Sequence, residues 1–335
     1  MSVKNQITIA EIARQLEVSK TLVSLVVNGK GDKHNISEST QKKVWDKVKE
    51  LNYKPNSVAR SLRTGKTQSI GLIVADIANP FYARLARIIE DYLRPFGYHL
   101  VISSSDETAE NEVNLIDTMI EHQVDGLIIA STQKDSEKFH ELQSKNYPFV
   151  LIDRYINDIQ TNYVGVDNYS GAYSMTTELL KSGYDKVYYL SVTPDYLSTI
   201  KERERGYLDA LSEIPPLIRK VDFNAPHKDL ENIIKEIMNA DIHKPVLFSS
   251  NNHVAKACLR ILRSYGIKIP EDIALVSFDD IELFEFSDPP IAAISQPIDR
   301  MGRFAADVLL KQLSGKTQYP VKHILKTTLV NRKSF

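Results

Sequence analysis

Polar side chains follow several of the strands predicted from this sequence, at the point where each strand ends. Asp76, Ser131 and Asp153 hold such positions in the first half of the chain, and Asn251 and Asp279 hold them in the second. Because the carboxyl ends of parallel strands meet at one edge of a sheet, we expect these groups to converge. Carboxylates, amides and hydroxyls of this kind recognise a polar small molecule through hydrogen bonds. The alternative interpretation, that a residue only caps the helix after it, applies to Asp76, Asn251 and Asn168.

Short β-branched runs alternate with amphipathic helical stretches after Lys66. The predicted strands are Ile70–Ala75, Leu100–Ser103, Gly126–Ala130, Phe149–Asp153, Val187–Ser191, Val246–Ser249 and Ile273–Phe278. Helical periodicity lies between them, at Phe81–Leu93, Glu110–His122, Tyr169–Lys181 and Val254–Tyr265. This alternation predicts an α/β core of two doubly wound parallel-sheet subdomains, with helices on both faces of each sheet.

The first 66 residues differ from the rest of the chain in charge. They contain 13 Lys and Arg against 6 Asp and Glu, a balance of +7, whereas the whole chain carries −1, which leaves −8 for the remainder. A small basic segment on an acidic body is typical of a nucleic-acid-binding module joined to a second domain. A solvated basic helix at a chain end would give the same balance.

Three short helices are predicted in this basic segment. Their capping residues are Thr8, Ser19 and Ser37, and the second helix stops at Asn28-Gly29. Two short helices joined by a tight turn are the sequence form of a DNA-reading helix-turn-helix, although an ordinary helical hairpin has the same pattern. Along the third helix we expect Trp45 to pack in a three-helix core.

Composition excludes several classes of protein. With 42% apolar residues the chain can bury more than one core, and no apolar run approaches the ~20 residues that span a bilayer. The N-terminus lacks the apolar segment of a secretory signal, so we expect a cytoplasmic protein. Cys258 is the only cysteine, and we expect it to pack in a core. No His or Cys spacing is typical of a metal site, so we predict no cofactor and no metal.

Several motifs resemble the LacI/GalR family of bacterial transcriptional regulators. They follow one another along nearly the whole chain and include Thr8–Ala13, Val18–Lys20, Tyr53–Lys66, Ile70–Val74, Asn79–Tyr82, Val124–Ile128, Gly165–Asn168, Ser277–Asp280 and Gln296-Pro297. The resemblance implies a three-helix DNA-binding head at residues 1–55 and a hinge helix with its linker at residues 56–67. It implies a periplasmic-binding-protein-like domain at residues 68–335, which binds an effector between its two subdomains and dimerises.

The resemblance also implies which residues contact DNA. Lys20 and Thr21 match the base-reading positions at the start of the recognition helix. The positions that contact phosphates match Thr8, Ser19, Ser24, Asn28 and Thr40. In the hinge, Leu62, with Ala59 beside it, matches a leucine that enters the minor groove and bends the duplex. Packing of Leu62 on Val58 is the alternative interpretation.

The effector-binding positions of the family match residues from both halves of the body. They are Phe81, Tyr82, Ser131, Asp153, Thr199, Arg203, Phe223, Asn251 and Asp279. Arg203 could donate hydrogen bonds to vicinal hydroxyls and Asp279 could accept them, while the aromatic rings stack on a sugar ring. This chemistry suits a sugar or a sugar derivative.

The sequence departs from the family pattern at several positions. Leu22 and Leu25 replace the usual threonine and arginine of the recognition helix, and the turn Lys30–Asn35 is longer than usual, so we carry over no family operator. Asn252 replaces the usual aspartate near the cleft. Leu197 stands where the purine-responsive branch has an arginine, which argues against a nucleobase ligand.

The leading hypothesis is a repressor that binds a near-palindromic double-stranded DNA operator as a homodimer under the control of a sugar-like effector. The alternatives are a solute-binding protein and a sugar-directed enzyme, neither with a role in gene regulation. The basic head argues against the first alternative. The absence of a phosphate-binding loop or nucleophile–base motif argues against the second, so we expect no enzyme and no catalytic residue. No leucine heptads follow the last strand-like run, so we expect a dimer.

Overall fold

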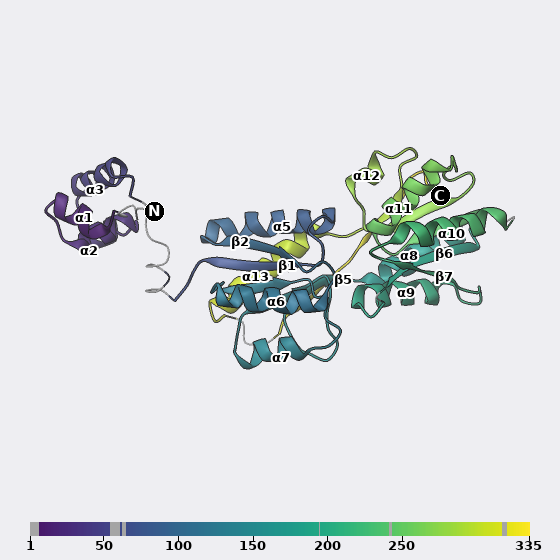
Figure 1. Cartoon of the computed structure of the whole chain (residues 1–335), viewed down its shortest axis with the longest axis horizontal. Helices are drawn as coiled ribbons and strands as arrows, with labels where there is room; N and C mark the ends of the chain where they lie inside the picture. Colours follow the sequence, from purple (N-terminus) through teal and green to yellow (C-terminus); the bar gives the residue numbers. More distant parts are fainter. Residues whose placement is uncertain (1–6, 54–60, 62–64, 194, 241–242, 317–319) are drawn as a thin grey trace. The chain divides into compact units, whose positions relative to one another are not determined.

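The computed structural model describes residues 7–53, 61, 65–193, 195–240, 243–316 and 320–335. The chain divides into two compact units, residues 1–67 and residues 68–335. Figure 1 shows both units and labels their α-helices and several of the strands. We describe each unit separately.

The described residues of the first unit contain three α-helices, α1 (Ile9–Gln15), α2 (Lys20–Val27) and α3 (Glu38–Glu50), with a 3-10 turn, η1, at Asp32–His34. The predicted caps are confirmed, because the hydroxyls of Thr8, Ser19 and Ser37 each accept a hydrogen bond from a backbone N–H in the first turn of the helix that follows. The side chains buried in its core are Ile12, Ala13, Val23, Val26, Val44 and Val48.

The prediction that Trp45 packs in this core is wrong. Its side chain is 41% exposed, whereas Val44 and Val48 are buried. Successive residues of an α-helix are rotated by about 100°, so Val44 and Val48 share the inward face and Trp45 does not.

In the second unit, the first subdomain is a sheet with the strand order β11-β5-β4-β3-β1-β2 and every pair parallel. Its strands are β1 (Ser69–Val74), β2 (His99–Ser104), β3 (Gly126–Ile129), β4 (Phe149–Ile152), β5 (Tyr163–Val166) and β11 (Lys322–Leu325). One face is covered by α5 (Pro80–Leu93) and α13 (Ile298–Leu313). The other is covered by α6 (Ala109–Glu121) and α7 (Glu137–Ser144). The 3-10 turn η2 (Arg94–Phe96) follows α5.

The second subdomain repeats this plan with the strand order β12-β10-β9-β8-β6-β7. Its strands are β6 (Lys186–Thr193), β7 (Leu217–Asp222), β8 (Pro245–Ser249), β9 (Ala274–Phe278), β10 (Ala292–Ser295) and β12 (Thr328–Val330). Its helices are α8 (Asn168–Lys181), α9 (Ser198–Ala210), α10 (Pro226–Asn239), α11 (Asn252–Ser264) and α12 (Glu282–Glu285). The predicted parallel sheets are confirmed except at β12, which runs antiparallel to β10.

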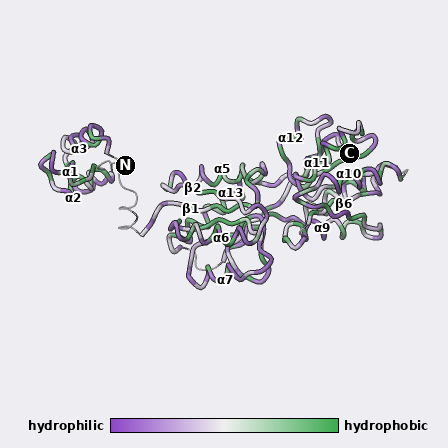
Figure 2. Tube along the Cα trace, in the orientation of Figure 1, coloured by the Kyte–Doolittle hydropathy of each residue, from purple (hydrophilic) through white to green (hydrophobic). Residues whose placement is uncertain are grey.

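Each sheet is sandwiched between two apolar layers. Strands such as β1, β4, β8 and β9 are buried along almost their whole length, which explains why they are continuous apolar runs. Figure 2 shows these hydrophobic stretches inside each subdomain and hydrophilic ones at the turns. Cys258 is buried on α11, as predicted.

The chain crosses between the subdomains three times: from β5 to α8, from β10 to α13, and from β11 to β12. The carboxyl ends of the central strands lie beside these crossings (Figure 1). Two subdomains linked in this way enclose a cleft and can rotate against each other about short connections.

Candidate functional site

Two aspartates mark the ends of equivalent strands in the two sheets. Asp153 follows β4 and Asp279 follows β9, and both have left-handed backbones, with φ of 65° and 72°. A residue with a Cβ adopts this region at a cost, and such strained positions cluster at ligand-binding sites. Both aspartates were predicted from the sequence as effector ligands.

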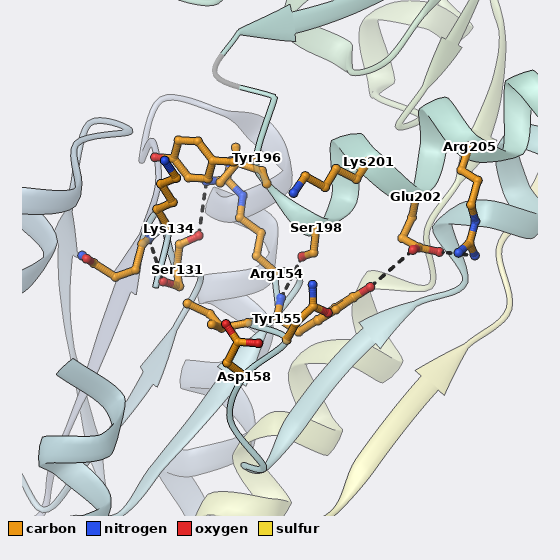
Figure 3. Close-up of a pocket in the computed structure, with 14 residues that line it drawn as sticks. Ser131, Lys134, Arg154, Tyr155, Asp158, Tyr196, Ser198, Lys201, Glu202 and Arg205 are labelled. Carbon is orange, nitrogen blue, oxygen red and sulfur yellow. Dashed lines mark hydrogen bonds and ion pairs between the residues drawn. The ribbon is translucent and has the colours of Figure 1, made fainter. Parts of the chain in front are cut away.

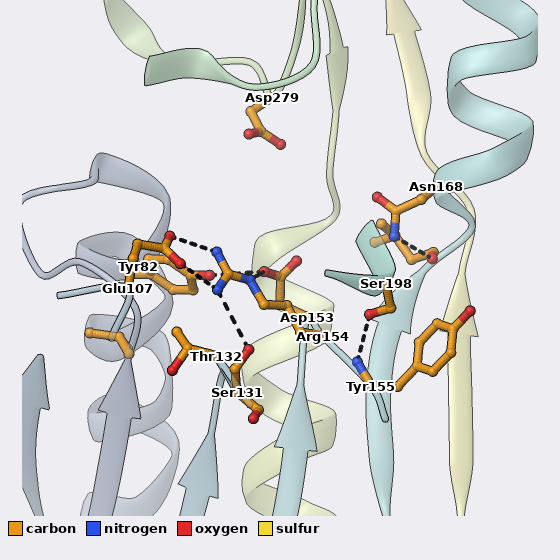
Figure 4. Close-up of polar contacts among 12 residues, drawn as sticks. Tyr82, Glu107, Ser131, Thr132, Asp153, Arg154, Tyr155, Asn168, Ser198 and Asp279 are labelled. Atoms are coloured by element: carbon orange, nitrogen blue, oxygen red, sulfur yellow. Dashed lines mark hydrogen bonds and ion pairs between the residues drawn. The ribbon is translucent and has the colours of Figure 1, made fainter. Parts of the chain in front are cut away.

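The first subdomain contributes a buried carboxylate with one free oxygen. Oδ2 of Asp153 accepts a hydrogen bond from the Tyr82 hydroxyl at 3.0 Å, while Oδ1 has no partner among the described residues (Figure 4). Burial raises the pKa of the Asp153 carboxyl and raises that of the Tyr82 hydroxyl well above its usual range. An unpartnered buried oxygen is the group that a ligand donor would satisfy.

Arg154 is held in place by a carboxylate from the loop after β2. Its Nη1 and Nη2 each donate to an oxygen of Glu107 at 2.7 Å, a bidentate geometry in which both side chains are about nine-tenths buried. Its Nε makes no hydrogen bond to any described residue and lies 3.9 Å from Oδ2 of Asp153. The charge of Arg154 is therefore compensated by Glu107, while its Nε can still donate a hydrogen bond to a ligand.

Ser131 is brought to the cleft, but its hydroxyl already has a partner. The Ser131 hydroxyl donates a hydrogen bond at 2.8 Å to the carboxylate of Glu112, a fully buried residue of α6. The same carboxylate also accepts hydrogen bonds from the backbone N–H and the hydroxyl of Thr132. Burial raises the pKa of the Glu112 carboxyl. Sequence reasoning missed Glu112, although it shares the inward face of α6 with Ile116 and Met119. We infer that Glu112 fixes the loop after β3.

The second subdomain contributes an arginine fixed on four sides. Nε of Arg203 donates to Oδ1 of Asn168 and Nη1 donates to the Ser250 carbonyl, both at 2.8 Å, and Nη2 lies 3.6 Å from Oδ1 of Asp279. The guanidinium lies 3.7 Å above the ring of Phe278. These contacts leave Arg203 almost no rotational freedom.

Close packing of α8 on α9 makes this arrangement possible. A Cβ at Gly206, one turn beyond Arg203, would lie 2.3 Å from the Tyr169 carbonyl, so only glycine allows the two helices to approach so closely. The approach brings Asn168, at the start of α8, within reach of Arg203. Asn168 is not the cap of α8, because Asp167 accepts the capping hydrogen bond.

Asp279 is surrounded by donors that the sequence did not identify as site residues. Nε2 of Gln296 donates to Oδ1 at 2.6 Å, and the backbone and side-chain amides of Asn252 approach Oδ2 at 3.4 Å. Oε1 of Gln296 and Oδ1 of Asn252 are buried and have no partner among the described residues, and the same holds for the hydroxyl of Ser250. The site therefore holds free acceptors from both subdomains.

The remaining predicted effector residues surround this polar centre in different ways. Phe81 and Thr199 are buried, and Phe81 packs edge-on against Tyr82. Phe223 is half-buried and stacks on His253 with 4.7 Å between ring centres. Oδ1 of Asn251 caps α11, and Asn251 also lines a small pocket of the cleft together with Phe223.

A larger cavity of about 580 Å³ adjoins the polar centre (Figure 3). Its walls come from both subdomains, with residues 131–158 on one side and residues 196–205 on the other. Two hydrogen bonds cross it: the Tyr196 hydroxyl donates to the Thr132 carbonyl, and the Tyr155 amide donates to the Ser198 hydroxyl, both at 2.9 Å. In this cleft, both subdomains contribute polar groups to an open volume large enough for a small ligand.

In the first unit, Lys20 and Thr21 lie exposed in the first turn of α2. Nδ2 of Asn28 donates to the Ser24 carbonyl at 2.6 Å, which places both residues at the other end of the same helix. The Thr40 hydroxyl lies 2.8 Å from that of Ser37. Ala59 and Leu62 lie outside the described residues.

Comparison with known proteins identifies the two units. Residues 8–56 match the model of bacterial regulatory proteins of the lacI family, and residues 176–335 match that of the periplasmic binding protein-like domain. The chain is 30% identical to the HTH-type transcriptional repressor PurR of Aliivibrio salmonicida, over 98% of each protein. It is also 30% identical to the ribose operon repressor of Halalkalibacterium halodurans, over 98% of this chain and 96% of that one.

The chain belongs to the lacI family. It is a DNA-binding transcriptional regulator.

Solved structures agree with the fold of this regulator. The Lac repressor dimer bound to operator has a TM-score of 0.85 with 23% identity, covering 98% of this chain and 99% of that one. The transcriptional regulator CelR in complex with cellobiose has a TM-score of 0.71 with 26% identity, covering 98% of this chain and all of that one. Within the described part of the regulator, no helix is long and apolar enough to cross a membrane, and no cluster of side chains could hold a metal ion.

Proposed function

We propose that this regulator is a repressor that binds a near-palindromic operator as a homodimer, and that a sugar or sugar derivative in the cleft controls its affinity for that operator. The observation that carries this proposal is the placement of Asp153 and Asp279 at the ends of equivalent strands in the two subdomains, with Arg203 fixed beside Asp279. Acceptors and a donor placed around a partly apolar space suit a ligand with several hydroxyls.

The chemistry of the cleft favours a sugar over a purely apolar ligand. The free oxygens of Asp153, Asn252 and Gln296 accept hydrogen bonds, as hydroxyl donors require. The ring of Phe223 offers a flat apolar face, as sugar rings require. Solved relatives hold related ligands: one is the CelR–cellobiose complex, and another is a LacI family regulator from Enterococcus faecium with bound ribose.

On the DNA side, we propose that Lys20 and Thr21 read base edges in the major groove. Both are exposed at the start of α2, the helix end that carries base contacts in helix-turn-helix proteins. The phosphate contacts are proposed to come from Thr8, Ser19, Ser24, Asn28 and Thr40. The hydroxyls of Thr8 and Ser19 accept from the backbone as caps, and each still has its own O–H to donate to a phosphate.

We assign the proposed functions to the three segments that were predicted from the sequence. Residues 1–55 bind DNA and residues 56–67 form the hinge, in which Leu62 and Ala59 enter the minor groove. Residues 68–335 bind the effector and dimerise. The two units found at residues 1–67 and 68–335 are compatible with this division.

Exposed apolar side chains in the second unit support a homodimer. Val101 and Ile102 on the edge strand β2 are 43% and 42% exposed, and Phe286, just after α12, is 73% exposed. An apolar edge strand that is exposed to solvent is prone to association, so we expect a partner subunit to bury these side chains. The related Lac repressor is a dimer on its operator.

Selection of bound DNA from a random pool, repeated with candidate sugars, tests the proposal. We expect a two-fold symmetric sequence to emerge and at least one sugar to change its recovery. Recovery of an asymmetric half-site protected by a monomer would contradict the dimer. Turnover of a sugar without any effect on DNA binding would favour the enzyme instead.

A further inference from the structure

The cavity at the mouth of the cleft carries more positive charge than its own carboxylates balance. Four cationic side chains line it, against two carboxylates, those of Asp158 and Glu202. The cations are Lys134, Arg154, Lys201 and Arg205. Arg154 pairs with Glu107, and Arg205 pairs with Glu202. Among the described residues, neither lysine forms an ion pair, so two free cations face one free carboxylate.

The backbone of α9 adds to this positive potential. The helix begins at the cavity, where Leu197 and Ser198 line the wall, and it extends for 13 residues. No side chain caps it and no acidic residue lies in its first turn. The first N–H groups and the positive end of the helix dipole therefore remain available to an anion.

Arg154 supplies an independent pointer to a ligand. The residue is only 8% exposed and its side chain lines the cavity, while its Nε has no hydrogen-bond partner among the described residues and lies 3.9 Å from Oδ2 of Asp153. Figure 3 shows Lys201 extending from α9 into the space beside Arg154 and Tyr196. A buried donor without a partner costs free energy unless something occupies the space in front of it.

We propose that the effector carries an anionic group, a phosphate or a carboxylate, and that Lys134 and Lys201 bind it in this cavity. The inference rests on the proposed function, because it adds an anion to the sugar held by Asp153 and Asp279. Arg154 and Leu197 line both this cavity and a small pocket that reaches Phe223. One ligand can therefore extend from this cavity to the small pocket beside Phe223. The volume of about 580 Å³ falls within the range of small-ligand sites.

Calorimetry on the full-length regulator tests this proposal with four probes at constant ionic strength: inorganic phosphate, glucose 6-phosphate, glucuronate and glucose. We expect at least one anionic probe to bind, and we expect Lys134→Gln with Lys201→Gln to weaken it roughly tenfold or more, as loss of charge-assisted hydrogen bonds implies. Lys201→Arg, which keeps the charge, should retain most of the affinity. Lys186→Gln is the matched control, because this exposed lysine begins β6 at the opposite end of its sheet.

The outcomes separate the two proposals. Anion binding that is lost in the double lysine variant and kept in Lys186→Gln supports the anion site, and preference for phosphate or for glucuronate distinguishes its two sources. No anion binding, or equal binding by the double variant, overturns it. A neutral sugar that changes operator affinity would still leave the proposed function standing. Conversely, anion binding through the two lysines without any ligand effect on DNA would overturn the proposed function alone.

Discussion

The DNA-reading head and the ligand-binding body place their functional side chains in opposite environments. Lys20 and Thr21 are exposed on a helix whose other face closes a small apolar core. Arg203 and Asp279 are 4% and 7% exposed and form a buried ion pair at 3.6 Å in the cleft. The head can therefore change its sequence preference without changing its stability, whereas changes at the effector site alter both ligand binding and folding.

A second contrast lies within the cleft itself. Asp279 is surrounded by donors from Arg203, Gln296 and Asn252 before any ligand arrives. Asp153 accepts a hydrogen bond from Tyr82, and its Oδ1 has no partner in the part of the chain that the structure describes. In the second subdomain, Asp279 is thus held in a fixed orientation by its hydrogen-bond donors. In the first subdomain, Oδ1 of Asp153 can gain a hydrogen-bond partner when a ligand binds.

The largest expected effect is a loss of stability in Asp279→Asn. This change removes the charge that compensates Arg203, and breaking a buried pair typically costs ~3–5 kcal/mol. Urea denaturation of the variant should show that loss in the free energy of unfolding. Asp299→Asn is the matched control, because its pair with Arg303 is exposed and such pairs contribute about 0–1 kcal/mol. Equal losses of unfolding free energy in the two variants would contradict the expectation that the buried ion pair contributes more to stability than the exposed one.

The next effect concerns DNA and should leave stability unchanged. Lys20→Ala should reduce the binding free energy for the preferred base at one operator position by ~1–3 kcal/mol and relax the base preference there. Ser24→Ala, in the same helix, should weaken specific and random DNA alike. Binding assays on a set of single-base operator variants make this comparison. A uniform loss for Lys20→Ala would assign the lysine to phosphate contact.

The smallest expected effect is a change in the pH dependence of stability in Asp153→Asn. Burial raises the folded-state pKa of Asp153 above its ordinary value of 3.8, so its contribution to stability is present below that pH and is lost as pH rises through the folded pKa. The variant has no carboxyl to titrate at this position, so it does not lose this contribution. The free energy of unfolding of the variant minus that of the wild type should therefore increase as pH rises. Arg154 keeps Glu107, so no charge is left unpaired. A difference between the two proteins that does not vary with pH would show that Asp153 titrates normally.

Much of the fold was predictable because local patterns specify it. The apolar runs at β1, β4 and β9 and the caps of α1, α2 and α3 follow from short-range chemistry. The strands β5, β7, β10, β11 and β12 were not among the predicted strands; β12, for example, is three residues long and pairs with β10 only after separate parts of the chain meet. Trp45 was misplaced because hydrophobicity alone does not give the rotation of a helix.

The site was partly predictable for a related reason. Asp153 and Asp279 follow strands, and that position is visible in the sequence. Gln296 and Glu112 act through partners on other elements, and only the folded chain brings these partners within hydrogen-bond distance. Asn251 combines both expectations, since its Oδ1 caps α11 and the residue also lines a small pocket of the cleft.

Operator affinity measured across a panel of sugars and anionic sugar derivatives, with wild type and Asp279→Asn side by side, tests the central claim most directly. The account predicts that one ligand shifts the wild-type Kd for the operator by roughly 5–150-fold. It also predicts that the folded variant binds the operator but no longer responds to that ligand. A ligand response that survives unchanged in the variant would place the controlling site outside the cleft and contradict the account.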